Sequence, residues 1–423
     1  MKPFSTGTSV PNASNDAITS DAPTHPDDSS ACESPRSLET ITRLVRFDTT
    51  SRHSNLALID WVQEYLAGHG ISSRLTHDDG RTKANLFASI GDPTQPGIVL
   101  SGHTDVVPAD GQDWSVDPFA GVVREDRLIA RGAADMKSFL GIVLHAVPQM
   151  LAKRLRMPIH LAFSYDEEVG CIGVGRMIRD MQAIGIAPGM CIVGEPTSMR
   201  VVTGHKGKLA MHARVCGRES HSAYAPTAVN AVDYAAEIVV QLRRMQREKA
   251  ERGPFNREYD PPFSTIHTGV FRGGTALNIV PRECDIDFEF RTIPEDDAHV
   301  LRDAIASYCE RELLPQMRRV APESRIDLET RSDNPALHND ESAEIAARIE
   351  ALARNGRGGK VAFASEAGQF QRAGFEAIIC GPGSIDDAHK PDEFITFDQI
   401  RRGEAFISRM IALAATDTDH SVA

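Results

Sequence analysis

The stretch "GIVLSGHTDVVP", residues 97–108, decides the fold. It opens with an apolar run that is typical of a short buried strand, and it continues into polar residues. The stretches "MPIHLAFSYDEE" (157–168) and "GMCIVGEPT" (189–197) repeat this order of an apolar strand followed by charged residues. Helical apolar spacing lies between them, over 134–154 and 172–185. Strands that alternate with helices predict an α/β domain with a largely parallel sheet covered on both faces.

The middle of the chain has a different character. The stretches "HKGKLAMHARVCGR" (205–218) and "STIHTGVFRGG" (264–274) look strand-like, and "ECDIDFEFRTI" (283–293) alternates polar and apolar residues almost perfectly. Such alternation predicts an antiparallel sheet with one solvated face. Two helical stretches, near 227–251 and 297–318, and a last short strand give the order β-α-β-β-α-β. This order predicts a small α+β domain of the ferredoxin-like kind.

The domain boundaries follow from this change of character. A chain of 423 residues is longer than a single core usually supports. We predict a first domain built from 37–204 and 334–423, with the α+β domain inserted at 205–333. Residues 1–36 are rich in Ser, Thr, Pro, Asn and Asp, and such a segment cannot offset its ordering entropy. We therefore predict a disordered tail there.

The composition argues against several classes of partner. The net charge of −13 disfavours nucleic acid, which binds basic surfaces. The most apolar segment, "FLGIVLHAVPQML" from Phe139, is too short to span a membrane and carries His145, which we interpret as a core histidine. Seven cysteines, an odd and scattered set, and a first segment without an apolar run favour a cytoplasmic protein without disulfides.

Polar side chains follow the predicted strands of the first domain at the points where the strands end. In open α/β sheets the ligand crevice lies at the carboxyl ends of the strands, so we expect these side chains to meet. Of two more polar residues, one follows the strand predicted at "FEAIICGPG" (375–383) and the other lies at the start of the helix predicted over 134–154. The whole set is His103, Asp105, Asp135, Glu167, Glu168, Glu195 and His389.

Each of these residues alone has an ordinary explanation. A single acid after a strand is usually solvated, and a single histidine in "GHTD" is more often a turn residue than a ligand. Taken together, the two histidines and three of the five carboxylates offer the nitrogen and oxygen donors that suit Zn²⁺, Co²⁺ or Mn²⁺. A mononuclear site needs only three or four ligands, so five ligands indicate two metals that share one carboxylate.

Seven ordered blocks of the sequence resemble the M20 family of co-catalytic zinc hydrolases, and within it the acetylornithine deacetylases of the ArgE type. The resemblance runs from about Ser37 to the C-terminal helix. It implies a zinc exopeptidase-like catalytic domain with an inserted lid and dimerisation domain. The blocks are "GHTDVVPADGQDWSVDPF", "RGAADMK", "FSYDEEVG", "IVGEPT", "GRESHSA", "GGTALNIVP" and "CGPGSIDDAHKPDEF".

The resemblance implies two divalent metal ions per subunit, Zn²⁺ or Co²⁺. It implies that His103 and Glu195 hold one ion, that Glu168 and His389 hold the other, and that Asp135 bridges them. All five belong to the set of seven polar residues that the sequence pattern indicates.

The resemblance also assigns roles next to the metals. Asp105 would accept the second N–H of the His103 imidazole and thereby orient the ring. Glu167 would be the general base. Neighbouring residues on an extended chain point to opposite sides, so Glu168 can face a metal while Glu167 faces the attacking water. For Asp166 we expect only a solvent-facing or loop-shaping role.

The inserted domain supplies three further residues in this resemblance. His221 would reach the active site across a homodimer and stabilise the tetrahedral oxyanion. Asn278 and Arg291 would bind the carboxylate of the substrate, which an arginine fork fits bidentately. Without the motif, His221 would be an exposed loop histidine, and a structural ion pair is a fair alternative for Arg291.

The expected reaction is the hydrolysis of N²-acetyl-L-ornithine to ornithine and acetate, a step of arginine biosynthesis. The match of "CGPGSIDDAHKPDEF" and "EAGQFQ" to that branch motivates this expectation. The alternatives are succinyl-diaminopimelate, other N-acyl amino acids and dipeptides, or a binding protein that kept the fold but lost catalysis. A nucleotide-dependent enzyme would need a phosphate loop, and "GCIGVG" does not fit that pattern.

Overall fold

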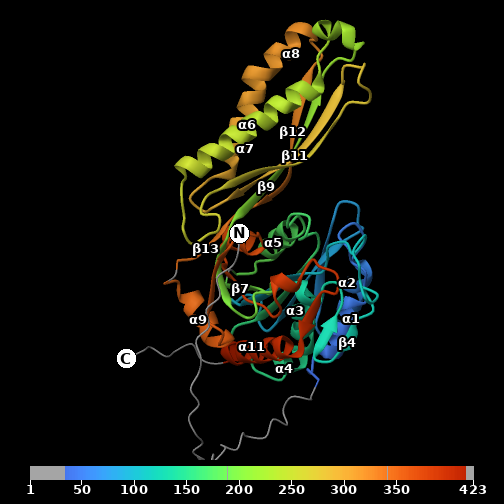
Figure 1. The fold of residues 1–423 in the computed structure, drawn as a ribbon. Helices are drawn as coiled ribbons and strands as arrows, with labels where there is room; N and C mark the ends of the chain where they lie inside the picture. The colour runs from blue at the N-terminus through green and yellow to red at the C-terminus, as the bar shows by residue number, and fades with distance from the viewer. Residues whose placement is uncertain (1–33, 188, 341, 416–423) are drawn as a thin grey trace, which may run out of the picture. The chain divides into compact units, whose positions relative to one another are not determined.

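The computed structural model describes residues 34–187, 189–340 and 342–415 and contains a nine-stranded mixed sheet (Figure 1). The strand order is β1-β2-β6-β3-β7-β15-β8-β13, and β14 pairs with β8. The strands are β1 (Ser73–His77), β2 (Ala84–Ile90), β3 (Ile98–His103), β6 (Ile159–Ser164), β7 (Met190–Val193), β8 (Val201–His205), β13 (Leu337–His338), β14 (Arg357–Val361) and β15 (Glu376–Ile379).

The middle of this sheet is parallel and its flanks are antiparallel. Strands β6, β3, β7 and β15 run parallel, whereas β1, β2 and β13 pair in the antiparallel sense. All six residues of β3 are buried, which explains the apolar run at its start. The predicted α/β class is therefore confirmed, with parallel pairing concentrated at the centre.

Helices cover both faces of the sheet, as predicted. On β3, Leu100 belongs to a core shared with α1, α2, α3, α4, α9 and α11, whereas its neighbour Val99 belongs to a second core shared with α5 and α10. Successive strand residues point to opposite faces, so one strand feeds two cores. The helices are α1 (Leu38–Val45), α2 (Leu56–Gly68), α3 (Ser138–His145), α4 (Val147–Leu151), α5 (Val174–Ala183), α9 (Glu344–Ala353), α10 (Ala367–Arg372) and α11 (Phe397–Ala415).

The long helix expected over 134–154 starts later than expected and is divided into α3 and α4. Residues Ala133–Lys137 form an irregular turn, and α4 starts anew with Pro148 in its first turn. Proline lacks an N–H and cannot continue the preceding helix, which explains the break. His145 ends α3 and is exposed, so its interpretation as a core histidine was wrong.

A small sheet that the sequence did not predict joins two distant blocks. It has the order β16-β5-β4, with β4 (Val122–Arg124), β5 (Arg127–Ile129) and β16 (Phe394–Thr396). The pairing of β16 with β5 brings the end of "CGPGSIDDAHKPDEF" beside the start of "RGAADMK". The guanidinium of Arg127 lies 4.4 Å from the ring centre of Phe394 and reinforces this contact.

The inserted segment contains a four-stranded antiparallel sheet with its own core. The strand order is β10-β11-β9-β12, and burial alternates residue by residue along β11. Its apolar face packs on α6 (Ala231–Arg252), α7 (Ala298–Tyr308) and α8 (Leu314–Val320). The strands are β9 (Gly207–Cys216), β10 (Thr265–Gly273), β11 (Glu283–Thr292) and β12 (Arg325–Asn334).

The described residues from Pro35 onward group into one compact unit, which is not divided at the predicted domain boundaries. Those boundaries therefore stay a prediction. The predicted tail, residues 1–36, lies outside the described residues except for its last three. Across the described ranges, no helix is both long and apolar enough to cross a membrane. The six cysteines within those ranges are all free and buried.

One buried histidine makes the stability of the sheet sensitive to pH. His160 in β6 is fully buried, its Nδ1 lies 2.8 Å from the Ser89 hydroxyl, and no described residue hydrogen-bonds to its Nε2. Burial lowers the pKa of His160 to about 4. The unfolded chain therefore takes up a proton on this residue at a higher pH than the folded protein does.

We expect His160 to contribute stability above about pH 6.5 and to lose that contribution as the pH falls toward 4, by about 3 kcal/mol in total. Replacing it by glutamine should flatten the pH dependence in that window. Urea unfolding of wild type and His160→Gln at pH 7.5 and pH 5 measures the difference. Exposed His145→Gln serves as the control, and parallel curves for wild type and His160→Gln would contradict the assignment.

Candidate active site

Parallel pairing at the centre of the sheet brings three strand ends to one edge. His103 is the last residue of β3 and pairs in register with Ser164, the last residue of β6. Glu167 and Glu168 follow β6 within four residues, and Glu195 follows β7 within two. The common edge is therefore lined by a histidine and three acids.

The structure brings together all five predicted metal ligands. Potential ligand atoms of His103, Asp135 and Glu195 all lie within 4.8 Å of one another, and so do those of Asp135, Glu168 and His389. Asp135 belongs to both groups. These are the two groups, and the shared carboxylate, that the sequence analysis expected.

The carboxylate of Asp135 faces a different imidazole with each oxygen. Its Oδ1 lies 3.0 Å from Nε2 of His103, and its Oδ2 lies 3.2 Å from Nε2 of His389. Nε2 of His389 is also 3.2 Å from Oε1 of Glu168. Asp135 is thus placed to serve two neighbouring positions at once.

The backbone around Asp135 is held by a buried ion pair that the sequence analysis did not identify. The amides of Ala134 and Asp135 donate to Oε1 of Glu393 at 2.9 and 3.1 Å. Glu393 Oε2 pairs with Arg131 at 2.6 Å, and both side chains are almost completely buried. Both residues stand in quoted blocks, "KPDEF" and "RGAADMK", but only their contact in the fold reveals this role.

Asp105 orients His103 in a different way from the one expected. Nδ1 of His103 lies 2.9 Å from the main-chain carbonyl of Asp105 and 3.6 Å from its carboxylate. Because a carbonyl only accepts, Nδ1 carries a hydrogen, and in the neutral ring Nε2 would present its lone pair to an ion. The Asp105 carboxylate instead accepts from the amides of Glu167 and Glu168, at 3.1 and 3.3 Å, and from the Ser51 hydroxyl at 2.7 Å.

The three consecutive acids make three different contacts. Glu168 contacts His389, whereas Oε1 of Glu167 accepts a hydrogen bond from the Cys171 thiol at 3.0 Å. Glu167 lies outside both groups of candidate ligands. Asp166 pairs with Lys83, has a positive φ of 57° and a side chain only 15% exposed, so it shapes the loop and does not face solvent.

The site concentrates buried negative charge. Burial raises the pKa of the carboxyls of Glu167, Glu168 and Glu195. Burial alone would also raise the pKa of Asp135, but hydrogen bonds from the two histidines lower it. Hydrogen bonds to Asp135 and Glu168 raise the pKa of His389 to about 10.

The donor set fits divalent cations. The Oε1 atom of Glu195 is buried, and none of the described residues hydrogen-bonds to it. A buried carboxylate oxygen without a partner is costly, and a bound cation would remove that cost. Two imidazoles and three carboxylates also form the mixed nitrogen and oxygen set that Zn²⁺ and Co²⁺ accept.

Two predicted residues of the insert, His221 in "GRESHSA" and Asn278 in "GGTALNIVP", lie on segments that pair with each other. Residue His221 bridges to Ile279 in the loop that carries Asn278, and both predicted residues are exposed. Nδ1 of His221 accepts from the amide of Ala223 at 3.1 Å, so in the neutral ring Nε2 carries the hydrogen and can donate. Arg291 on β11 donates through Nε to Glu289 at 2.9 Å, which is the ion pair considered as its alternative role.

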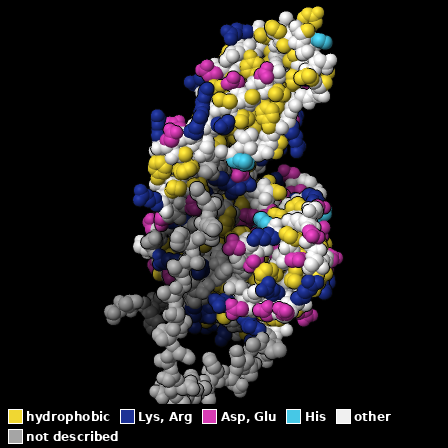
Figure 2. Space-filling view, viewed as in Figure 1, with side chains coloured by type: hydrophobic (Ala, Val, Ile, Leu, Met, Phe, Trp, Pro, Cys, Tyr) yellow, Lys and Arg dark blue, Asp and Glu magenta, His cyan; other side chains and the backbone are white. Residues whose placement is uncertain are grey.

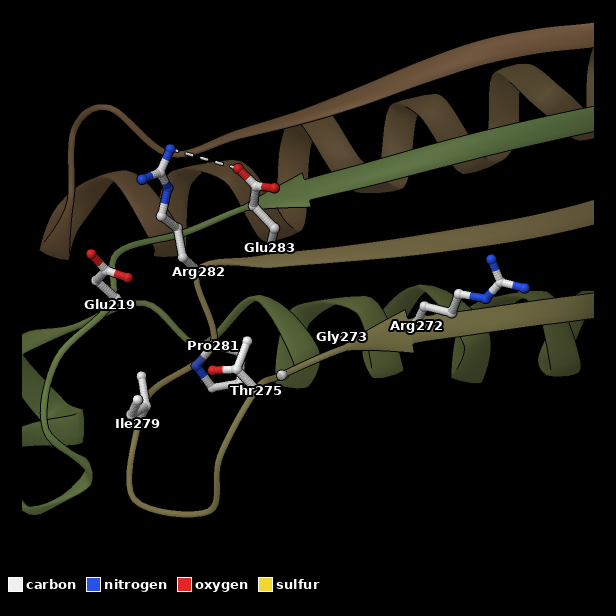
Figure 3. A pocket seen from close by; sticks show the side chains of 9 residues that line it. Glu219, Arg272, Gly273, Thr275, Ile279, Pro281, Arg282 and Glu283 are labelled. Atoms are coloured by element: carbon white, nitrogen blue, oxygen red, sulfur yellow. Dashed lines mark ion pairs between the residues drawn. The ribbon is translucent and has the colours of Figure 1, made fainter.

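An open pocket of the insert lies beside these motifs, and Figure 3 shows its lining. Arg282 and Glu283 pair across 3.6 Å at one side of it. Neither His221 nor Asn278 lines this pocket, so it does not coincide with the predicted substrate contacts. Its lining residues are Glu219, Arg272, Gly273, Gly274, Thr275, Ile279, Pro281, Arg282 and Glu283.

Similarity to solved structures concerns the fold. The M20 family metallo-carboxypeptidase Sso-CP2 of Sulfolobus solfataricus matches with a TM-score of 0.69 at 17% identity, over 90% of this chain and 99% of that one. The dipeptidase Dug1p of Saccharomyces cerevisiae matches with a TM-score of 0.68 at 14% identity, over 91% and 96%. At these identities the comparison confirms the predicted fold class and nothing finer.

Sequence comparison identifies the family. An acetylornithine deacetylase of Myxococcus xanthus is 31% identical over 382 residues, which are 88% of this chain and 96% of that protein. An acetylornithine deacetylase of Pasteurella multocida (strain Pm70) is 30% identical over 368 residues, 86% and 92% of the two chains. Residues 99–413 match the model of peptidase family M20/M25/M40. The chain therefore belongs to peptidase family M20/M25/M40 and is a hydrolase of that family.

Proposed function

We propose that the protein is a dinuclear-metal amidohydrolase that removes the acyl group from an N-acyl amino acid, with N²-acetyl-L-ornithine as the preferred substrate. The observation that carries this proposal is the Asp135 carboxylate, which belongs to two groups of candidate ligands while Glu167 lies beside them and outside both. The acetylornithine deacetylases that match most of the chain support the choice of substrate. The products would be ornithine and acetate, as in arginine biosynthesis, and we place the reaction in the cytoplasm.

We propose that His103 and Glu195 hold one divalent ion, that Glu168 and His389 hold the other, and that Asp135 bridges them. Zn²⁺ and Co²⁺ are the expected ions. When bound, such a pair supplies Lewis-acid polarisation of the scissile carbonyl and a more acidic water.

The protein's own residues would carry the proton and orient the reactants. Glu167 would take a proton from the attacking water and deliver it to the nitrogen of the leaving amine while the C–N bond breaks. Asp105 would hold Glu167 and Glu168 in place through the amide hydrogen bonds to its carboxylate. The carbonyl of Asp105 would keep Nε2 of His103 directed at its ion.

We assign the remaining roles to the insert. The Nε2–H of His221 would donate to the oxyanion of the tetrahedral intermediate. Asn278 and Arg291 would bind the carboxylate of the small-molecule substrate. Because Nε of Arg291 donates its hydrogen bond to Glu289, Arg291 would contact the substrate through its terminal nitrogens.

A related substrate is the second candidate function. The solved relatives include enzymes named as a carboxypeptidase and a dipeptidase, which favours short peptides as the alternative to acetylornithine. Succinyl-diaminopimelate and other N-acyl amino acids are the remaining alternatives. All of them share the amide bond and the free carboxylate that the proposed site would bind.

A substrate panel tests the proposed specificity. We expect the metal-reconstituted enzyme to hydrolyse N²-acetyl-L-ornithine with a kcat/KM at least about tenfold above that for N-acetylmethionine, succinyl-diaminopimelate or dipeptides, because a single well-placed contact is worth about 1.4 kcal/mol. Release of the free amine is the readout. If acetylornithine were hydrolysed no faster than acetylmethionine or the dipeptides, the protein would be a general aminoacylase or peptidase.

Removal of the metal or of the base should abolish turnover in different ways. Chelation should stop hydrolysis, and Zn²⁺ or Co²⁺ should restore it, because both candidate ligand groups need their cations.

Glu167→Ala should lower kcat by about 10²- to 10⁴-fold while two metals per chain stay bound. Metal analysis alongside kinetics separates the two effects, and normal turnover of metal-loaded Glu167→Ala would refute the base assignment.

We also propose that the protein forms a homodimer through the insert. Strand β10 lies at the edge of the four-stranded sheet, and an edge strand presents unpaired backbone groups to a partner. The loop that follows it exposes Leu277 completely and Ile279 by 42%, and Phe271 on β10 is also 42% exposed. Figure 2 shows apolar side chains gathered on the visible surface of the insert. A second copy of this chain would cover them.

Subunit mixing tests both the dimer and the proposed reach of His221. Glu167→Ala and His221→Ala chains should each be inactive, but their mixture should regain up to about a quarter of wild-type activity. In a mixed dimer, one site receives an intact Glu167 from its own chain and an intact His221 from its partner. Unmixed variants are the control. A mixture that stays inactive after proven subunit exchange would show that His221 does not act across a dimer.

A further inference from the structure

The turn after the acidic stretch folds a thiol back onto the proposed base. The amides of Gly170 and Cys171 both donate to the carbonyl of Glu167 at 2.8 Å. Cys171 adopts a left-handed backbone conformation, with φ of 54°. This turn brings Sγ of Cys171 to 3.0 Å from Oε1 of Glu167, a contact that links two side chains four residues apart.

Two amide side chains hold Cys171 in this position. Nε2 of Gln369 donates to the carbonyl of Cys171 at 2.7 Å. Nδ2 of Asn334 lies 3.4 Å from Sγ of Cys171 and donates to the carbonyl of Ser365 at 2.9 Å, which defines the orientation of the amide. The sulfur therefore accepts from Asn334, and its own hydrogen is left for Glu167.

The thiol stays protonated in this environment. Cys171 is only 4% exposed, and burial raises the pKa of its thiol well above the ordinary range. A thiol is also a weak donor, so it can orient a carboxylate without greatly reducing its basicity. A positively charged donor at the same place would stabilise the carboxylate strongly and weaken it as a base.

We propose that Cys171 is a positioning residue for Glu167, whose S–H···Oε1 bond fixes the carboxylate so that its other oxygen meets the attacking water. The inference rests on the proposed function, in which Glu167 is the base. A glutamate side chain has several rotatable bonds, and a displacement of the order of 1 Å at a reacting group can lower the rate by about 100-fold. Asn334, the last residue of β12, extends this arrangement to the point where the chain leaves the four-stranded sheet.

The chain offers a matched control for the loss of a buried thiol. Cys191 on β7 is fully buried and belongs to the same hydrophobic core as Cys171. Its thiol faces apolar neighbours of that core and has no part in the proposed chemistry. Cys191→Ala therefore reports the effect of removing a buried sulfur alone.

The test compares Cys171→Ala, Cys171→Ser and Cys191→Ala as full-length, metal-loaded proteins. We expect Cys171→Ala to lower kcat about tenfold, with KM changed less than about twofold, because the substrate contacts stay intact while the base loses its orientation. Cys171→Ser keeps a donor at this position and should restore kcat to within about twofold of wild type. Cys191→Ala should leave kcat unchanged. Metal content and thermal midpoint are measured for each variant on the same preparation.

The outcomes separate this inference from the proposed function. Wild-type kcat in Cys171→Ala, with Glu167→Ala inactive, would leave Glu167 as the base and overturn the role of Cys171. A stable, metal-loaded Cys171→Ser with kcat as low as that of Cys171→Ala would also overturn it, because hydrogen-bond donation would then not explain the loss. If Cys171→Ala does not fold, Cys171→Gly takes its place, because glycine readily adopts the left-handed backbone of this position and also lacks a donor. The same tenfold loss of kcat is then expected, and wild-type kcat in this variant would overturn the role of Cys171.

Discussion

The burial of several carboxylates at one edge of the sheet is the constraint on which the rest of the site depends. Asp135, Glu168 and Glu195 lie close together, and one oxygen of Glu195 has no hydrogen-bond partner among the described residues. Carboxylates in such surroundings are costly unless positive charge balances them. Two imidazoles meet part of this need, and a pair of divalent cations would meet the rest. The clustering of these donors and the proposed metal chemistry therefore both follow from the need to balance buried negative charge.

The fold solves this problem with rigid elements around the acids. Parallel strands deliver His103 and the acidic stretch to one edge, and the buried pair of Arg131 and Glu393 anchors the backbone that carries Asp135. Asp105 contributes through both its carbonyl and its carboxylate, so one residue orients the imidazole and braces the acidic stretch. Residues outside the proposed ligand set thus determine where the ligands and the proposed base lie.

Much of the fold was predictable from the sequence, because the periodicity of apolar residues reports local structure and burial. Alternation predicted β9, β10 and β11, and continuous apolar runs predicted β3, β6 and β7. The strands β4, β5 and β16 were missed because three residues each are too few to show a period, and the antiparallel flanks were missed because a strand's local pattern does not name its partner. The break at Pro148 was missed because the apolar spacing continues across it. The exposure of His145 shows that apolar neighbours in sequence do not fix the side of a helix on which a residue lies.

The sequence by itself determined which residues can form the site, because donor type and position after a strand are local properties. The pattern placed His103, Asp135, Glu168, Glu195 and His389 among seven candidates, and the resemblance to the M20 family singled out these five as ligands. The structure brings them together. Only the tertiary structure decided the contacts that orient them. The carbonyl of Asp105 rather than its carboxylate meets His103, Glu393 holds the amides at Asp135, and Cys171 contacts Glu167. Hydrogen-bond partners depend on distances of a few tenths of an ångström between atoms far apart in the chain, and no local pattern of residues encodes such distances.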